Sequence, residues 1–134
     1  KNQINRCGLN VLEEKSLMEV LILFFNLVIG HCVGDYVLQL GPMSSAKSRH
    51  SKLKEQYGED FPQWYYWLTA HALTHAGIVI LITGNYMFAI LELISHWFID
   101  FCKCEKWITL HQDQMAHMVF KIIYCAIFFM SLSS

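Results

Sequence analysis

The sequence is poor in charged residues and has almost no proline. Charged side chains make up 16% of its 134 residues and hydrophobic ones 54%, whereas soluble domains average about 25% charged residues. The 10 Lys and Arg residues nearly balance the 11 Asp and Glu residues, which leaves a net charge of −1. Because positive charge is not in excess, no nucleic-acid-binding surface is expected. The length indicates a single domain.

The cysteines are too scattered to form a disulfide framework. Their number, five, is odd, and the closest two, Cys102 and Cys104, form CxC rather than the CxxC of common zinc sites. No succession of basic, apolar and small residues near the N-terminus marks a signal peptide. Pro42 and Pro62 both lie outside the apolar segments, so the broken helices typical of many transporters are not expected.

Four apolar segments contain most of the hydrophobic residues. Each is close to the roughly 17–25 residues that a membrane-spanning helix needs, although the third is short. Only Gly84 and Asn85 separate the second from the third, so these two helices should be antiparallel neighbours. The segments cover about residues 17–40, 64–83, 86–102 and 113–132. The sequence therefore predicts an all-α fold, a four-transmembrane-helix up-down bundle over 17–134, with a polar N-terminal segment at 1–16.

A polar loop at about 41–63 joins the first two segments. Its middle is expected to form one short helix that begins near Ser44 or Ser45 and ends near Gly58. The run WYYW (64–67) follows directly and is typical of an aromatic belt at a membrane–water interface. This loop is a candidate lid for a site at the same end of the bundle.

A soluble four-helix bundle is the alternative to a membrane protein. Helices of a soluble bundle carry a charged outer face, and such faces are missing here. The stretches LILFFNLVIG (21–30) and GIVILIT (77–83) are apolar on all sides. The membrane interpretation is therefore favoured, with lipid as a neighbour of the chain and with homo-oligomerisation left open.

Positive charge is unevenly distributed between the two ends of the expected bundle. The loops after the first and third segments carry more Lys and Arg than the opposite end, so the positive-inside rule places that end in the cytoplasm and both termini across a bacterial inner membrane. The first group is Lys47, Arg49, Lys52, Lys54, Lys103 and Lys106, and the second is Lys1, Arg6 and Lys15.

Ionisable residues interrupt every apolar segment at intervals of four. The run LELISHWFIDF (91–101) shows the pattern best, because three ionisable side chains occur in strict register within it. Residues four apart lie on one helix face about one turn apart, so each helix should present a single polar stripe. The stripes are His31 and Asp35; His71 and His75; Glu92, His96 and Asp100; and Asp113, His117 and Lys121.

All four stripes should lie at the same level of the bundle. A charged residue at the bilayer centre costs roughly 2.5–3.5 kcal/mol, so these groups should face inward and neutralise one another. Five histidines and four carboxylates suit one or two Zn²⁺ ions, with Fe or Mn as alternatives. The proposed metal ligands are His31, Asp35, His71, His75, Glu92, His96, Asp100, Asp113 and His117. A structural polar network and a proton or ion pathway are the other interpretations.

Three residues of the stripes are candidates for catalytic roles. Glu92 is expected to act as a ligand or general base, and Asp35 belongs to the same catalytic set. Lys121 is either a countercharge for Glu92 or a group that polarises a substrate oxygen. Two glutamines beside the stripes, Gln39 and Gln114, are expected to hydrogen-bond to the ligands.

Three further positions lie near these stripes. Gly34 should allow two helices to approach closely. His50, in the loop, is expected to be a solvated surface residue. His111, near the same end as the stripes, is a weaker candidate ligand.

Four blocks of the sequence resemble a family of small polytopic membrane proteins of bacteria and phages, known as domain of unknown function 3307. The blocks are HCVGDYVLQ (31–39), HALTH (71–75), HWFID followed by Cys102 and Lys103 (96–103), and DQMAH (113–117). The resemblance covers about residues 20–130 and implies a membrane protein without an established reaction. A looser likeness, in motif style only, is to inner-membrane metal-dependent hydrolases.

These observations lead to a functional hypothesis with two alternatives. We expect an integral membrane metal-dependent hydrolase that acts on a lipid or other membrane-associated ester or phosphoester. One alternative is a di-iron membrane oxidase, although the HxxHH clusters of such enzymes are missing. The other is a non-enzymatic membrane protein, either an ion or proton pathway or a phage factor that modifies the host envelope.

Overall fold

The protein is all-helical in the computed structural model, which describes residues 2–39 and 41–132 and the side chains from residue 14 onward. Within these ranges no strand is found, so the predicted all-α class is confirmed. The elements are α1 (Asn2–Cys32), the π-helix η1 (Val33–Val37), α2 (Gly41–Ala46), α3 (Leu53–Tyr57), α4 (Trp64–Thr83), α5 (Tyr86–Cys104) and α6 (Leu110–Leu132).

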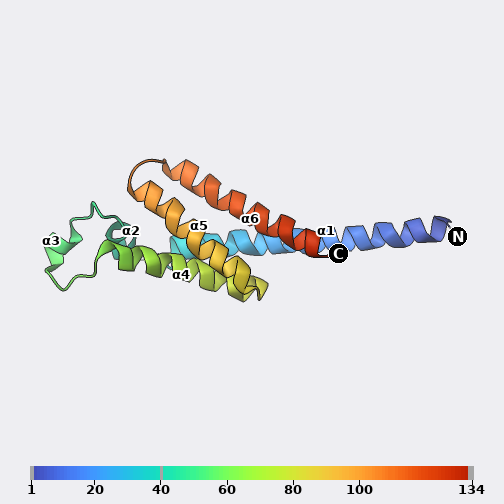
Figure 1. Ribbon diagram of the computed structural model, residues 1–134, viewed down its shortest axis with the longest axis horizontal. Helices are drawn as coiled ribbons and strands as arrows, with labels where there is room; N and C mark the ends of the chain where they lie inside the picture. Colours follow the sequence, from blue (N-terminus) through green and yellow to red (C-terminus); the bar gives the residue numbers. More distant parts are fainter. Residues whose placement is uncertain (1, 40, 133–134) are drawn as a thin grey trace.

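Four long helices pack side by side and form an elongated body (Figure 1). Helix α1 contacts α4 and α6, and α5 contacts the same two helices. The end of α1, the start of α4, the end of α5 and the start of α6 lie toward one end, beside the short helices α2 and α3. A small apolar core, formed by Leu27, Val79, Phe88, Tyr124 and Cys125, lies among the helices.

The α4–α5 hairpin has the bounds and the turn that the sequence predicts. Helix α4 runs from Trp64 to Thr83, and Gly84 then takes the left-handed conformation with φ 63°, which glycine adopts without steric cost. The Asn85 side chain accepts a hydrogen bond of 2.8 Å from the Met87 backbone N–H and so caps α5.

Helix α1 begins further upstream than the apolar segment predicts. It starts at Asn2 rather than near residue 17, and its N-terminal part projects beyond the other helices (Figure 1). Residues 2–16 contain no proline and several good helix formers, so nothing in this polar stretch stops the helix.

The polar loop contains two short helices, α2 and α3, instead of the single one expected. The predicted start is wrong, because Ser44 lies inside α2, where its hydroxyl donates to the Gly41 carbonyl at 2.8 Å. The predicted end is confirmed: Gly58 follows α3 with φ 95°, a conformation that favours glycine.

Apolar side chains cover much of the outer surface of the long helices. Phe25 is 65% exposed, Leu81 is 85% exposed and Phe98 is 59% exposed, a distribution unusual for a soluble monomer. By length and composition, the segments Glu14–Val37, Trp64–Thr83 and Leu110–Leu132 are able to cross a membrane. Helix α5 is not among them, since three acidic or basic residues fall within its 19 residues.

Candidate metal centre

The interior of the helical body is polar at the end where the short helices lie. Ten ionisable residues at this level are buried, with no more than 2% of each exposed, and Asp35 is the least enclosed member of the cluster. The ten are His31, Lys47, His71, His75, Glu92, His96, Asp100, Asp113, His117 and Lys121.

Asp35 is surrounded by imidazoles rather than by cationic side chains. Its Oδ1 lies 3.1 Å from His75 Nε2 and 3.3 Å from His71 Nε2. Its Oδ2 lies 3.4 Å from His31 Nε2 and accepts a hydrogen bond of 2.8 Å from Gln114 Nε2. Within the described part of the chain no lysine or arginine pairs with this carboxylate, so it suits a bound cation.

Asp100, on α5, contacts a lysine as well as histidines. Lys47 Nζ, from the loop, donates to Asp100 Oδ2 at 2.5 Å and to Gln39 Oε1 at 2.7 Å. The same Oδ2 lies 3.3 Å from His71 Nε2, whereas Oδ1 lies 3.9 Å from His117 Nε2. Asp100 therefore connects α4, α6 and the loop at one carboxylate.

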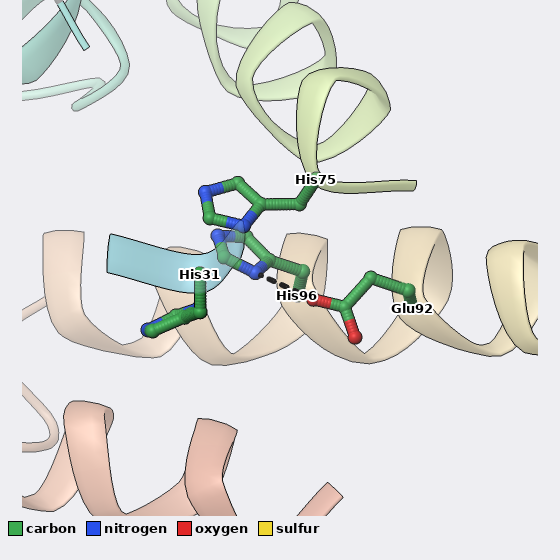
Figure 2. A group of neighbouring side chains, drawn as sticks. All are labelled: His31, His75, Glu92 and His96. Atoms are coloured by element: carbon green, nitrogen blue, oxygen red, sulfur yellow. Dashed lines mark hydrogen bonds and ion pairs between the residues drawn. The ribbon is translucent and has the colours of Figure 1, made fainter. Parts of the chain in front are cut away.

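Glu92 lies one turn from His96 on α5, and both its oxygens are occupied. Lys121 Nζ donates to Oε1 at 2.5 Å, and Tyr124 Oη donates to Oε2 at 3.0 Å. His96 Nδ1 is 3.3 Å from Oε1 (Figure 2). A carboxylate on Nδ1 fixes the orientation of an imidazole whose Nε2 binds a metal, and His96 Nε2 indeed faces His71 Nε2 at 3.2 Å.

Directly after α1, the backbone changes its helical geometry in the segment that lies against His75. From Val33 to Val37 the helix becomes a π-helix, with the Leu38 N–H donating to the Val33 carbonyl at 2.9 Å; π-turns are often found at functional sites. A Cβ at Gly34 would lie 2.4 Å from His75 Cε1. The close approach predicted at Gly34 is therefore made by the imidazole of His75.

The donor atoms of Asp35, His71, His75 and His96 all lie within 4.8 Å of one another, so the four residues could hold one metal ion. Three distances between them are 3.1, 3.2 and 3.3 Å, and bonds of 2.0–2.1 Å in a tetrahedron separate donors by about 3.3–3.4 Å. Figure 2 shows His31, His75 and His96 approaching from three different segments, with the His75 and His96 rings stacked at 3.7 Å.

Several polar atoms in the cluster have no hydrogen-bond partner among the described residues. They are His31 Nδ1, His75 Nε2, His117 Nε2 and Asp113 Oδ1, and His75 Nε2 lacks hydrogen-bond geometry despite its short distance to Asp35. Buried polar atoms are nearly always satisfied in folded proteins. The unpaired imidazole nitrogens at the centre are therefore available as ligands for a metal ion.

The nine residues predicted as ligands all lie at this cluster. Eight belong to three groups with converging donor atoms: His31, His75, Glu92 and His96; Asp35, His71, His75 and His96; and His96, Asp100 and His117. The ninth, Asp113, lies 3.7 Å from His117 and 3.8 Å from Lys103. His111 is exposed and outside the cluster, and His50 is exposed as expected and pairs with Glu105.

Two residues at the cluster carry no signal in the sequence. Lys47 belongs to a polar loop with three other Lys or Arg residues, and nothing in its spacing distinguishes it. Tyr124 resembles the other aromatic residues of an apolar helix, yet it is fully buried against Glu92. Lys103, which is partly buried, lies 3.8 Å from Asp113 Oδ2. The predicted partners Gln39 and Gln114 do contact the cluster, through Lys47 and Asp35.

Comparison of the sequence with known protein families gives a match over most of the chain. The family described as Protein of unknown function (DUF3307) matches residues 23–134, which include every ionisable residue of the four stripes. The chain belongs to the DUF3307 family. The expected resemblance is thereby confirmed, and it extends to the last residues of the chain. Neither the curated proteins nor the solved structures gave a match to this DUF3307 protein.

Proposed function

We propose that this DUF3307 protein is an integral membrane metal-dependent hydrolase. The observation that carries the proposal is the convergence of Asp35 Oδ1 and the Nε2 atoms of His71, His75 and His96, from three separate segments. Their spacing matches that of the ligands of a tetrahedral ion. Zn²⁺ fits these nitrogen and oxygen donors best, and Fe or Mn would accept the same set.

The charge of the cluster also supports a bound cation. Four carboxylates face two fully buried lysines, Lys47 and Lys121, which pair with Asp100 and Glu92. Asp35 has only imidazoles and an amide around it, and Asp113 has Lys103 at 3.8 Å. A buried carboxylate without a counter-ion is costly, and a divalent metal would remove that cost.

The membrane part of the proposal rests on the outward-facing apolar side chains and on the three segments able to cross a bilayer. We propose that α5 is the fourth span of an up-down bundle. Its charged side chains at Glu92 and Asp100 are buried, so they would cost little in lipid. Lys47 is buried as well, so the positive charge that favours a cytoplasmic site comes from the other five basic residues.

Each part of the centre would have a distinct role in hydrolysis. A bound divalent metal lowers the pKa of its water from 15.7 to about 7 and polarises the scissile group. Glu92, with both oxygens occupied, is suited to orienting His96, while Lys121 neutralises it. Asp35 is the most accessible carboxylate of the set, with 11% of its side chain exposed, so substrate would reach the metal on the side of this ligand.

The loop supports a substrate with a polar head group at the membrane surface. Lys47 and the Arg49–Glu105 ion pair fasten the loop to α5. A cleft of about 330 Å³ lies between the loop and the start of α4, lined by Ser48, Arg49, Ser51, Lys54 and Trp64 among others. Glu55 and Glu59 also line this cleft, and its two cations are paired with glutamates, Arg49 with Glu105 and Lys54 with Glu59. The cleft therefore offers hydroxyls and paired charges to the polar head group of a lipid ester or phosphoester.

Elemental analysis of the protein purified in detergent tests this proposal. His75→Ala and His96→Ala should lose bound metal and hydrolysis of ester or phosphoester lipids in vesicles, because each removes a donor from the set. The matched control is His111→Ala, which changes an exposed histidine of α6 and should keep both. Full metal content in both site variants would refute the assignment. Ion or proton conduction in liposomes without hydrolysis would support a pore instead, and iron with an oxygen requirement would support an oxidase.

A further inference from the structure

Two carboxylates at the centre each divide their oxygens between different sets of histidines. Asp35 directs Oδ1 toward His71 and His75, at 3.3 and 3.1 Å, and Oδ2 toward His31, at 3.4 Å. Asp100 directs Oδ2 toward His71, at 3.3 Å, and Oδ1 toward His117, at 3.9 Å. A carboxylate that divides its oxygens in this way can bridge a pair of metal ions; Asp100 Oδ2 would do so while it also accepts from Lys47 Nζ at 2.5 Å.

The histidines can be divided into two sets by the helices that carry them, although the His96 and His117 rings of the two sets stack at 4.1 Å. The first set, on α4 and α5, contains His71, His75 and His96. The second, on α1 and α6, contains His31 and His117, whose ring centroids are 4.8 Å apart, with Asp113 Oδ1 3.7 Å from His117 Nε2.

The second set has unused donor atoms of its own. His117 Nε2 and Asp113 Oδ1 are buried and make no hydrogen bond with any described residue. Among the described residues no lysine or arginine forms an ion pair with Asp35, and Lys103 approaches Asp113 at Oδ2, 3.8 Å away, rather than at Oδ1. Atoms of this kind need a partner, and a first-row divalent ion is the partner that imidazole and carboxylate share.

We propose that the centre is dinuclear: Asp35 and Asp100 bridge one ion held by His71, His75 and His96 and a second held by His31, His117 and Asp113. This inference rests on the proposed function and adds the second ion and the substrate class. Two divalent ions and the two buried lysines exceed the four carboxylates in charge, so the loaded centre is cationic. It therefore favours an anionic phosphoester over a neutral ester.

The reaction that this centre suits is hydrolysis of a phosphoester. Paired ions stabilise both the attacking and the leaving oxygen in such displacements. Water forms the new P–O bond, the P–O bond to the alcohol breaks, and the proton that water loses is passed to the departing alkoxide. No oxidant, reductant or further reactant is needed.

Metal stoichiometry in detergent-purified protein tests the second ion. Protein saturated with Zn²⁺ and freed of excess should hold two ions per chain, His117→Ala should hold one, and the control His111→Ala should hold two. One ion per chain in the wild type, together with metal-dependent hydrolysis, would overturn the dinuclear centre and leave the proposed function standing. No bound ion and no hydrolysis would overturn both.

A measurement on the unaltered chain guards against a variant that fails to fold. Metal-free protein is titrated with Mn²⁺ and followed by electron paramagnetic resonance. Carboxylate bridges should couple the two ions, so the single-ion signal should rise with the first equivalent and fall with the second. Saturation at one equivalent, or two uncoupled ions, would contradict bridging by Asp35 and Asp100.

The substrate class is tested by comparing substrates of equal chain length. The protein should hydrolyse a phosphomonoester or phosphodiester faster than a carboxylic ester, and the reverse preference would refute the substrate class.

Discussion

Gly34→Ala should disable the centre by moving one imidazole, without removing any donor atom. The new Cβ would lie 2.4 Å from His75 Cε1 and 2.5 Å from its Nε2, whereas carbon atoms in contact are about 3.5–4.0 Å apart. If the backbones of η1 and α4 keep their places, the ring must therefore shift by about 1 Å. Metal–ligand distances are held to about ±0.2 Å, so His75 would leave the coordination distance.

The expected loss is large enough to measure in a chelator competition. Disturbing a group that supports a ligand typically costs 10–100-fold in metal affinity, which corresponds to about 1.4–2.8 kcal/mol. Zn²⁺ affinity of Gly34→Ala in detergent should fall by at least this factor, and lipid hydrolysis should fall with it.

Gly77→Ala is the matched control, because a Cβ at Gly77 of α4 meets no atom within 4 Å. Alanine is favoured over glycine inside a helix by about 0.5–1 kcal/mol, so this variant should be as stable as the wild type or more so, with unchanged affinity. If Gly34→Ala bound Zn²⁺ as tightly as Gly77→Ala, His75 would not be a ligand.

The buried lysines and the imidazoles give the remaining predictions. Glu92→Gln leaves the Lys121 ammonium buried without a carboxylate and should destabilise the protein by about 3–5 kcal/mol. Adding Lys121→Met should restore much of the thermal stability, and an equally unstable double variant would contradict the pairing. Lys47→Met removes the ammonium that fastens the loop, so limited proteolysis should cut the loop faster than in the exposed control Lys52→Met; equal rates would show that other contacts hold it. Metal affinity should fall as the pH drops through the range in which the imidazoles take up protons, because protons compete with the metal for the neutral rings, and an affinity that stays constant through that range would exclude histidine ligands.

The polar cluster is predictable from the sequence because two simple regularities coincide. Spacing of four places His71 with His75, and His96 with Asp100, on single helix faces. The order of helices then sets which ends meet, and the two-residue turn at Gly84 fixes the antiparallel arrangement of α4 and α5. Both regularities are local, so no knowledge of side-chain packing is required.

Features that depend on packing are not predictable in the same way. The π-turn at Val33–Val37 has no spacing signal, and Gly34 marks only a place where a side chain would not fit. Lys47 reaches Asp100 across 53 positions of the chain, from a loop whose basic residues look alike. Helix α1 begins at Asn2 because the polar stretch before residue 17 has sufficient helix propensity. Hydropathy alone separates this stretch from the apolar segment and so misses the continuous helix.

The distribution of lysines indicates that the cluster is more than a network of carboxylates and cations that neutralise one another. A purely structural network in a membrane would match each carboxylate with a cation, as Glu92 is matched by Lys121 at 2.5 Å. Asp35 departs from this rule, since its neighbours are three imidazoles and one amide. Neutral imidazoles give no countercharge, and protonated ones would repel one another where rings approach to 3.7 Å. A divalent cation resolves both difficulties at once, because it binds neutral imidazoles and supplies the charge that Asp35 lacks.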